Sequence, residues 1–260
     1  MTENQYTGVW TLAETDGGRV ERIGHELLTR GRVLADARGA ELTAVALGCG
    51  IDSEGLQELI DRWVHDELYL YSKDDQRAMF ERVKMDGSPA LLEPEGRSIT
   101  PGHGLESCWF CLREGAYQND KRIIQRACEV TEWTMNIGWD VQYGGLYNFV
   151  DVMGKPPGHH DEDWGEDQDW DDKIFWVHAE ALYALLLAHE LSGEDRFFDW
   201  YEKIHEWSFK HFPDPEHGEW FGYLRRDGTV SQTLKGCTKA FFHLPRALLN
   251  CMLLLGSGNK

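Results

Sequence analysis

The sequence has 260 residues, of which 42% are hydrophobic and 27% charged, the composition of a globular protein with room for one large domain or two small ones. Its net charge of −19 excludes a nucleic-acid partner, because binding to phosphates needs a basic surface. There is no apolar run long enough for a membrane span, no basic and apolar signal peptide, and there are six cysteines; we therefore expect a cytoplasmic protein with reduced thiols.

Residues 1–75 alternate strand and helix patterns in the order β-α-β-α-β. Gly39 is expected to end the first helix, and Asp52 or Ser53 to cap the second. This order is typical of a parallel sheet with right-handed crossovers. The first segment is therefore predicted to be a small three-stranded parallel unit. Strands are expected at 8–14, 40–48 and 66–72, and helices at 21–39 and 52–63.

The glycines of "GCG", residues 48–50, lie between a predicted strand and a predicted helix. Backbone amides at such a place can meet an anion. The full six-position glycine fingerprint is absent, so a structural turn is favoured over a ligand loop.

The stretches "VWTLAE", "HELLTRGRVLADARGAELTAVALG" and "ELYLYSKDD" resemble the start of the electron-transfer flavoprotein alpha subunit. In that family this is part of the N-terminal domain, and flavin binds further on. The resemblance therefore implies a fold fragment. FAD is expected only under the alternative that the protein is a redox-partner module related to that subunit.

The sequence from residue 76 onward repeats itself with a period of 74 residues. Each unit contains a helix, a tight turn, a second helix and a short β-hairpin, and a third unit keeps only its first helix, residues 244–255. Helix pairs repeated in one direction form a curved solenoid or a closed toroid. The equivalent pairs include Glu106 with Glu180, Trp133 with Trp207, Asp140 with Asp214, and Gly144 with Gly218.

The first helix of each pair is the more apolar and is expected on the inside, so the N-termini of successive inner helices meet at one mouth. This places His103, Glu106, Glu180 and His243 together. Two histidines at one pocket can act as a general acid and base near neutral pH. Glu106, one helical turn after His103, could orient its ring. The alternative that each histidine is only a helix cap or a packing residue stays open.

The stretches "PEGRSITPGHGLESCWF", "GWDVQYGGLYNFVDVMGKP" and "KIFWVHAEALYALLLAHELSGEDRFF" resemble the N-acylglucosamine 2-epimerase family, as does "DPEHGEWFGYLRRDGTVSQTLKGCTKAFFHLPRALL". The resemblance implies a barrel of six helical hairpins that moves a proton at C2 of an open-chain sugar, with His103 and His243 as acid and base. It implies pocket roles for Glu106 and Glu180, and no redox cofactor. The expected substrate-binding residues are Trp176, Glu180, Trp220, Tyr147, Lys239 and Arg246.

The predicted fold class is thus α+β by segments: a flavoprotein-like fragment at residues 1–75, then an all-α half of an (α/α)6 barrel with short β-hairpins at residues 76–260. A half-barrel exposes apolar inner surface, so we expect a homo-oligomer or a partner protein that covers it. The expected function is that of a sugar 2-epimerase or aldose–ketose isomerase. The alternatives are the redox module and an inactive scaffold.

Two further patterns suggest metal or redox chemistry. Cys108 and Cys111 share a helix face, but no second cysteine pair has matching spacing, so two buried small residues are favoured over a zinc or redox site. The acidic stretch 159–172 fails the calcium-loop pattern and is predicted to be a solvated loop. No metal site is therefore predicted.

Overall fold

The computed structural model describes residues 9–13, 15–16, 19–20, 42–46, 53–155, 170–231 and 242–257. The chain divides into two compact units, Met1–Asp66 and Glu67–Lys260. Among the described residues, no helix combines the length and the apolar character needed to cross a membrane.

The described residues of the first unit include a parallel strand pair. Strand β1 (Val9–Ala13) pairs with β4 (Leu42–Ala46), with Val9 opposite Leu42. Strand β2 (Thr15–Asp16) pairs antiparallel with β3 (Arg19–Val20). Helix α2 (Ser53–His65) confirms the helix predicted at 52–63 and packs against β3. The predicted helix at 21–39 and the loop at 48–50 lie outside the described residues.

The predicted third strand at 66–72 is wrong. Residues Asp66–Tyr71 form a π-helical turn that continues directly from α2, and the Ser72 hydroxyl donates a hydrogen bond to the Glu67 carbonyl at 3.1 Å. No glycine or proline separates this segment from α2, so the helical path runs on. A short run of alternating apolar residues does not distinguish a strand from a helix end. The extended part is only β5 (Ser72–Lys73), which pairs antiparallel with β6 (Ala78–Met79).

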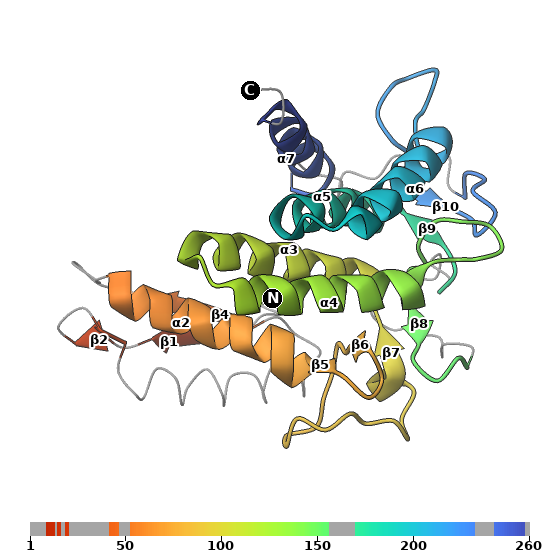
Figure 1. Cartoon of the computed structure of the whole chain (residues 1–260). Coiled ribbons are helices and arrows are strands. Elements are labelled where there is room, and N and C mark those ends of the chain that lie inside the picture. Colours follow the sequence, from red (N-terminus) through yellow and green to blue (C-terminus); the bar gives the residue numbers. More distant parts are fainter. Residues whose placement is uncertain are drawn as a thin grey trace, which may run out of the picture. The chain divides into compact units, whose positions relative to one another are not determined.

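The second unit consists of helical hairpins whose ends carry short strand pairs (Figure 1). Helix α3 packs against α4 and α5, and α5 packs in turn against α6 and α7. Strand β7 pairs antiparallel with β8, and β9 with β10. The 3-10 turn Glu95–Arg97 leads into β7. The bounds are β7 (Ser98–Ile99), α3 (Pro101–Gln118), α4 (Lys121–Gly138), β8 (Val150–Asp151), β9 (Lys173–Ile174), α5 (Phe175–Ser192), α6 (Asp195–His211), β10 (Tyr223–Leu224) and α7 (Leu244–Ser257).

The 74-residue repeat is present in the backbone. Helix α3 begins at residue 101 and α5 at residue 175, and each ends in a left-handed cap, at Asn119 (φ 56°) and Gly193 (φ 72°). Asn and Gly are the residues that tolerate this conformation best. The turns after the outer helices also match, because Gly145 and Glu219 have φ values of 73° and 64°. The two hairpins are therefore copies of one structural unit.

Gly145 and Glu219 differ in what surrounds them. A Cβ atom on Gly145 would lie 2.9 Å from the Trp207 ring and 3.0 Å from His178 Nε2, so no side chain fits there. Glu219 occupies the equivalent place with a full side chain. The first turn is therefore covered by helix α6, while the second turn has room for a side chain.

Helix α5 is the central inner helix. It is buried from Phe175 to Ala188 apart from Trp176, whereas α4 and α6 bury one side and expose the other. A helix that is apolar all round belongs in the interior. This burial places the polar side chains of α5, including that of Glu180, inside the molecule.

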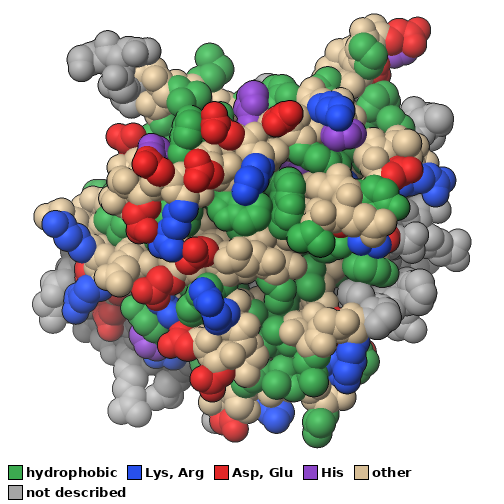
Figure 2. Space-filling view, turned by 45° about the vertical axis from the view of Figure 1, so that its right-hand side comes forward, with side chains coloured by type: hydrophobic (Ala, Val, Ile, Leu, Met, Phe, Trp, Pro, Cys, Tyr) green, Lys and Arg blue, Asp and Glu red, His purple; other side chains and the backbone are tan. Residues whose placement is uncertain are grey.

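Helix α7 is packed on one side only. Ala247 and Cys251, one turn apart, are buried, whereas Leu249, Met252 and Leu253 are 56%, 69% and 63% exposed. On the face of the molecule drawn in Figure 2, hydrophobic side chains also gather among charged ones. Exposed apolar surface of this extent is typical of a site of association.

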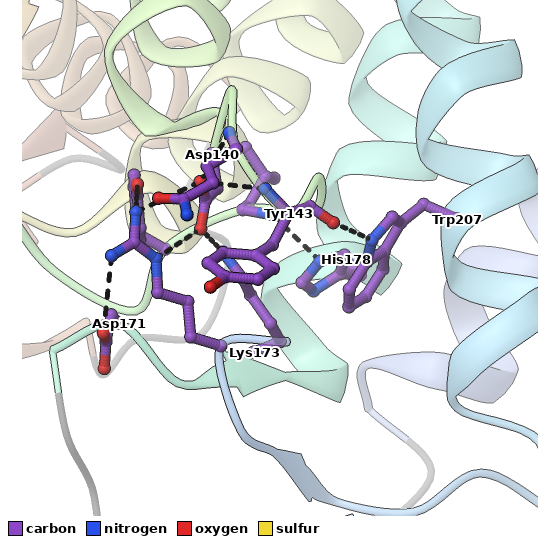
Figure 3. A network of polar contacts seen from close by, with 10 residues as sticks. Asp140, Tyr143, Asp171, Lys173, His178 and Trp207 are labelled. Atoms are coloured by element: carbon purple, nitrogen blue, oxygen red, sulfur yellow. Dashed lines mark hydrogen bonds and ion pairs between the residues drawn. The ribbon is translucent and has the colours of Figure 1, made fainter. Parts of the chain in front are cut away.

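A buried polar network joins the two hairpin ends (Figure 3). Asp140 and Lys173 have fully buried side chains, and Lys173 Nζ lies 3.1 Å from Asp140 Oδ2. Arg226 Nε donates to the same oxygen at 2.8 Å, and Arg226 Nη2 donates to the Tyr147 hydroxyl at 2.8 Å. The backbone amides of Gln142 and Tyr143 donate to Asp140 Oδ1. The carboxylate is therefore saturated with donors from both repeat units.

The charges in this network depend on one another. Burial alone would raise the pKa of Asp140, but hydrogen bonds from Arg226 and the charge of Lys173 hold it well below its usual value. Burial lowers the pKa of Lys173 to about 8, against the pull of Asp140. Burial also lowers the pKa of nearby His178 to about 3; this neutral ring accepts a hydrogen bond from the Leu146 amide at 3.0 Å.

We predict that Asp140→Asn lowers the free energy of unfolding by about 3 kcal/mol or more, because it leaves Lys173 and Arg226 without their shared anion. Urea denaturation measures this loss. Asp227→Asn is the control, since Asp227 is exposed and accepts turn hydrogen bonds from the Thr229 amide at 3.0 Å and the Thr229 hydroxyl at 2.7 Å. The control should cost less than about 1 kcal/mol, and an equal loss in both variants would refute the prediction.

Candidate active site

The carboxylate of Glu180 joins three inner helices. It lies on α5 and is fully buried. Its Oε2 accepts a hydrogen bond from Trp109 Nε1 of α3 at 2.6 Å. Its Oε1 accepts from Arg246 Nη2 of α7 and lies 2.6 Å from Nδ1 of His243, the residue directly before α7. A buried carboxylate needs hydrogen-bond or charge partners, and Trp109, Arg246 and His243 supply them here.

Arg246 is held between aromatic rings. Its guanidinium carbon lies 4.4 Å from the Trp109 ring centroid and 4.7 Å from that of Phe242. In the described part of the chain its Nη1 is buried and has no hydrogen-bond partner. A buried donor of this kind can bind an oxygen of a ligand.

Glu106 lies beside this group. One ligand atom each of Glu106, Glu180 and His243 lie within 4.8 Å of one another. Burial, followed by the neighbouring Glu180 charge, raises the pKa of Glu106 above its ordinary value. The spacing would admit a metal ion, but the Arg246 cation already occupies Glu180 Oε1 and would repel one. The donor set therefore fits a metal poorly.

His103 lies in the first turn of α3, and its partner is Glu81. Nδ1 lies 3.1 and 3.2 Å from the two carboxylate oxygens of Glu81. Burial would lower the pKa of His103, but Glu81 raises it to about 9, with smaller contributions from Glu106 and Glu67. The expectation that Glu106 orients this ring is therefore corrected: Glu81 does so. Glu81 lies 22 residues before His103 in no recognisable motif, so the sequence carried no signal for it.

Trp176 brings the two histidines together. Its ring centroid lies 5.1 Å from that of His103 and 5.3 Å from that of His243. A Cβ atom on Gly102 would come within 2.4 Å of the Trp176 ring, so the glycine permits this packing. A pocket opens beside the indole, lined by Thr100, His103, Asn148, Phe149, Ile174, Trp176 and Tyr223.

Some of the expected substrate-binding residues are elsewhere in the described structure. Tyr147 belongs to the Asp140 network, where its ring covers Lys173 Nζ at 4.2 Å. Trp220 is buried and stacks on Phe212, with ring centroids 5.1 Å apart. Both are aromatic residues at hairpin positions. The sequence did not show that Tyr147 packs on Lys173 of the following repeat unit, or that Trp220 packs on Phe212 of its own unit. Lys239 lies outside the described residues.

The cysteine pair is structural. Cys108 and Cys111 are free and buried in the core. Burial raises the pKa of Cys108 to about 12 and that of Cys111 well above its usual value. Thiols in this state react poorly. The interpretation of two buried small residues is therefore confirmed. The acidic stretch 159–172 lies mostly outside the described residues.

Two carboxylate-paired imidazoles on one indole, at the mouth of repeated helical hairpins, define a protein equipped for acid–base chemistry on a small ligand. The sequence matches the family described as N-acylglucosamine 2-epimerase (GlcNAc 2-epimerase) over residues 53–247. The chain belongs to this family, as its second segment predicted.

Individual relatives agree with this assignment. The chain is 36% identical to N-acylglucosamine 2-epimerase of Mus musculus over 204 residues, which cover 77% of this chain and 46% of that protein. A crystal structure of D-mannose isomerase superposes with a TM-score of 0.60 at 20% identity, covering 78% of this chain and 48% of that one. The chain thus spans about half the length of the curated relatives it matches.

A second, shorter match is to the electron transfer flavoprotein subunit alpha of Clostridium acetobutylicum. It is 44% identical over 48 residues, which cover 18% of this chain and 14% of that protein. A match of this length offers only weak support for the flavoprotein-like resemblance.

We predict that Glu106→Gln stabilises the protein by up to about 1 kcal/mol at neutral pH, because it removes a half-buried charge next to Glu180. A raised pKa in the folded state means that ionised Glu106 costs stability above that pKa. The gain should therefore disappear as the pH falls and wild-type Glu106 becomes protonated. Thermal unfolding at several pH values measures this, with Glu206→Gln on the exposed side of α6 as control. A Glu106→Gln protein less stable than wild type would contradict the prediction.

Proposed function

We propose that this protein is a carbohydrate 2-epimerase or aldose–ketose isomerase that moves a proton at C2 of an open-chain sugar. The observation that carries the proposal is that the His103 and His243 rings both lie close to the Trp176 ring, with centroids 5.1 and 5.3 Å away, and that each imidazole contacts a carboxylate. The names of the relatives support this substrate class, since they act on N-acylglucosamine and D-mannose. Trp176 also lines the pocket, so its indole is proposed to contact the sugar.

The proposed reaction has two proton transfers. One imidazole removes the proton from C2, the C–H electron pair forms a C1–C2 double bond, and the carbonyl electrons move onto O1 to give an enediolate. The other imidazolium then returns a proton. Return to the opposite face of C2 gives the epimer, and return to C1, with loss of the O2 proton to O1, gives the ketose. Only protons move, so the proposal includes no redox cofactor and no FAD.

The surroundings of the two histidines suggest their roles. Glu81 gives its charge mainly to His103, which favours the imidazolium and so the acid. Glu180 is in contact with Trp109, Arg246 and His243. With His103 as the acid, His243 is the second imidazole beside Trp176 and the proposed base. The free Nη1 donor of Arg246 is the proposed partner of the enediolate oxygen.

The proposed function also needs a molecule that covers the exposed face of α7. The exposed leucines of α7 lie where a further inner helix would pack if the α3–α5–α7 array continued. We propose that a second copy of the chain, or a partner protein, covers this surface and shields the site from water.

The activity test uses N-acetylmannosamine, mannose and cellobiose in deuterated water. We predict incorporation of deuterium at C2 together with formation of the C2 epimer or the ketose, read by proton NMR. His103→Gln and His243→Gln should each lower the rate at least about 100-fold, because each removes an acid or a base. His205→Gln, exposed on α6, is the control. Turnover that survives His243→Gln would overturn the assignment.

We predict that the purified chain has a larger mass than one copy, or binds a hydrophobic dye, because of the apolar face of α7. Light scattering after size exclusion measures the mass. Leu253→Lys should lower both signals, since a charge on this face opposes its burial. Leu92→Lys, at a site 95% exposed in a loop, is the control. A wild-type monomer that binds no dye would exclude an exposed association surface.

A further inference from the structure

We propose that Glu81 is a positioning residue of the candidate active site: it fixes the His103 ring with Nδ1–H toward itself and holds this imidazole in its protonated form. The inference deepens the proposed function, since it identifies the group that would make His103 the acid. Glu81 follows strand β6 in the sequence, outside the helical repeat that carries the other site residues.

The geometry fixes both the tautomer and the direction of the ring. Both carboxylate oxygens of Glu81 lie near one ring nitrogen, at 3.1 and 3.2 Å. A carboxylate accepts hydrogen bonds, so Nδ1 carries the proton in this pair. Nε2 is then the nitrogen that can meet a ligand in the pocket that His103 lines.

Thr100 holds the carboxylate in turn. Its side chain hydrogen-bonds to Glu81, and Thr100 lies directly before α3, one helical turn from His103. Thr100 gives no side-chain cap to the helix. The Thr100 side chain therefore bonds to Glu81 in place of a helix cap. The contacts from Thr100 to Glu81 and from Glu81 to His103 join the loop after β6 to the first turn of α3.

The charged groups around this pair act in one direction. Glu106 on α3 and Glu67 in the π-helical turn both favour protonated His103, and Arg82 favours ionised Glu81. Burial alone would raise the pKa of Glu81, but His103 lowers it, so the two groups stabilise each other's charge. Glu81 makes the largest favourable contribution to His103, at contact distance.

The test measures the proton on His103 directly and needs no sugar. The full chain is labelled with nitrogen-15, and the imidazole signals are followed by NMR from acid to alkaline pH, with His103→Gln used to assign the ring. We expect a titration midpoint near pH 9 in the wild type. Glu81→Gln should lower this midpoint by about 1–3 pH units, because the contact anion is lost while the burial remains.

Two further variants make the test specific. Glu81→Asp keeps the charge on a shorter arm and should give an intermediate midpoint. It also serves if Glu81→Gln fails to fold. Glu93→Gln, an exposed carboxylate in a loop of the same unit, should leave the midpoint unchanged. In wild type the neutral ring should carry its proton on Nδ1; an Nε2–H ring, or a midpoint that Glu81→Gln and Glu81→Asp both leave unchanged, would overturn the proposal.

If the chain turns over sugar, Glu81→Gln should also move the alkaline limb of the rate profile to lower pH, while Glu93→Gln should not. A lowered NMR midpoint in an inactive protein would support the role of Glu81 and count against the proposed function. An unchanged NMR midpoint in a protein that turns over sugar would support the proposed function and count against the role of Glu81.

Discussion

The buried carboxylate of Glu180 is the constraint on which the rest of the site depends. It accepts donors from α3 and α7 while lying on α5, so three consecutive inner helices meet at one buried carboxylate. A buried carboxylate without partners would be strongly unfavourable, and Trp109, Arg246 and His243 supply them. Glu106 lies at the edge of this group, and the rings of both histidines lie close to Trp176. The contacts that join α3, α5 and α7 therefore also gather the candidate active-site residues.

The two hairpins have the same backbone plan, but equivalent side chains make different contacts. Asp140 and Asp214 cap equivalent turns, and Asp140 also binds two cations from the following unit. That network lies next in sequence to residues of the pocket wall, since Ile174 follows Lys173 and Asn148 follows Tyr147. One repeat unit thus supplies the anion and the other supplies the charges that hold its loop in place.

Much of this arrangement could be predicted from the sequence, because helical periodicity and the 74-residue offset are local or regular signals. They located α3 to α7 and brought His103, Glu180 and His243 to one mouth. Glu81 was missed because its contact with His103 depends on the path of an irregular loop. The strand predicted at 66–72 failed because alternating apolar residues also suit a π-helical turn after α2. The contacts of Tyr147 with Lys173 and of Trp220 with Phe212 were not foreseen, because aromatic residues in a hairpin can pack on either side of it.

The turn at Gly145 limits how the array can be extended. There the indole of Trp207 approaches so closely that only a hydrogen atom fits on the α-carbon. The close contact arises because Trp207 belongs to the outer helix α6, which packs against this turn. Glu219 takes the same left-handed conformation at the equivalent place and carries a long charged side chain. A helix that packed over Glu219 as α6 packs over Gly145 would have to displace this side chain. The two equivalent turns therefore differ in how closely a neighbouring helix can approach them.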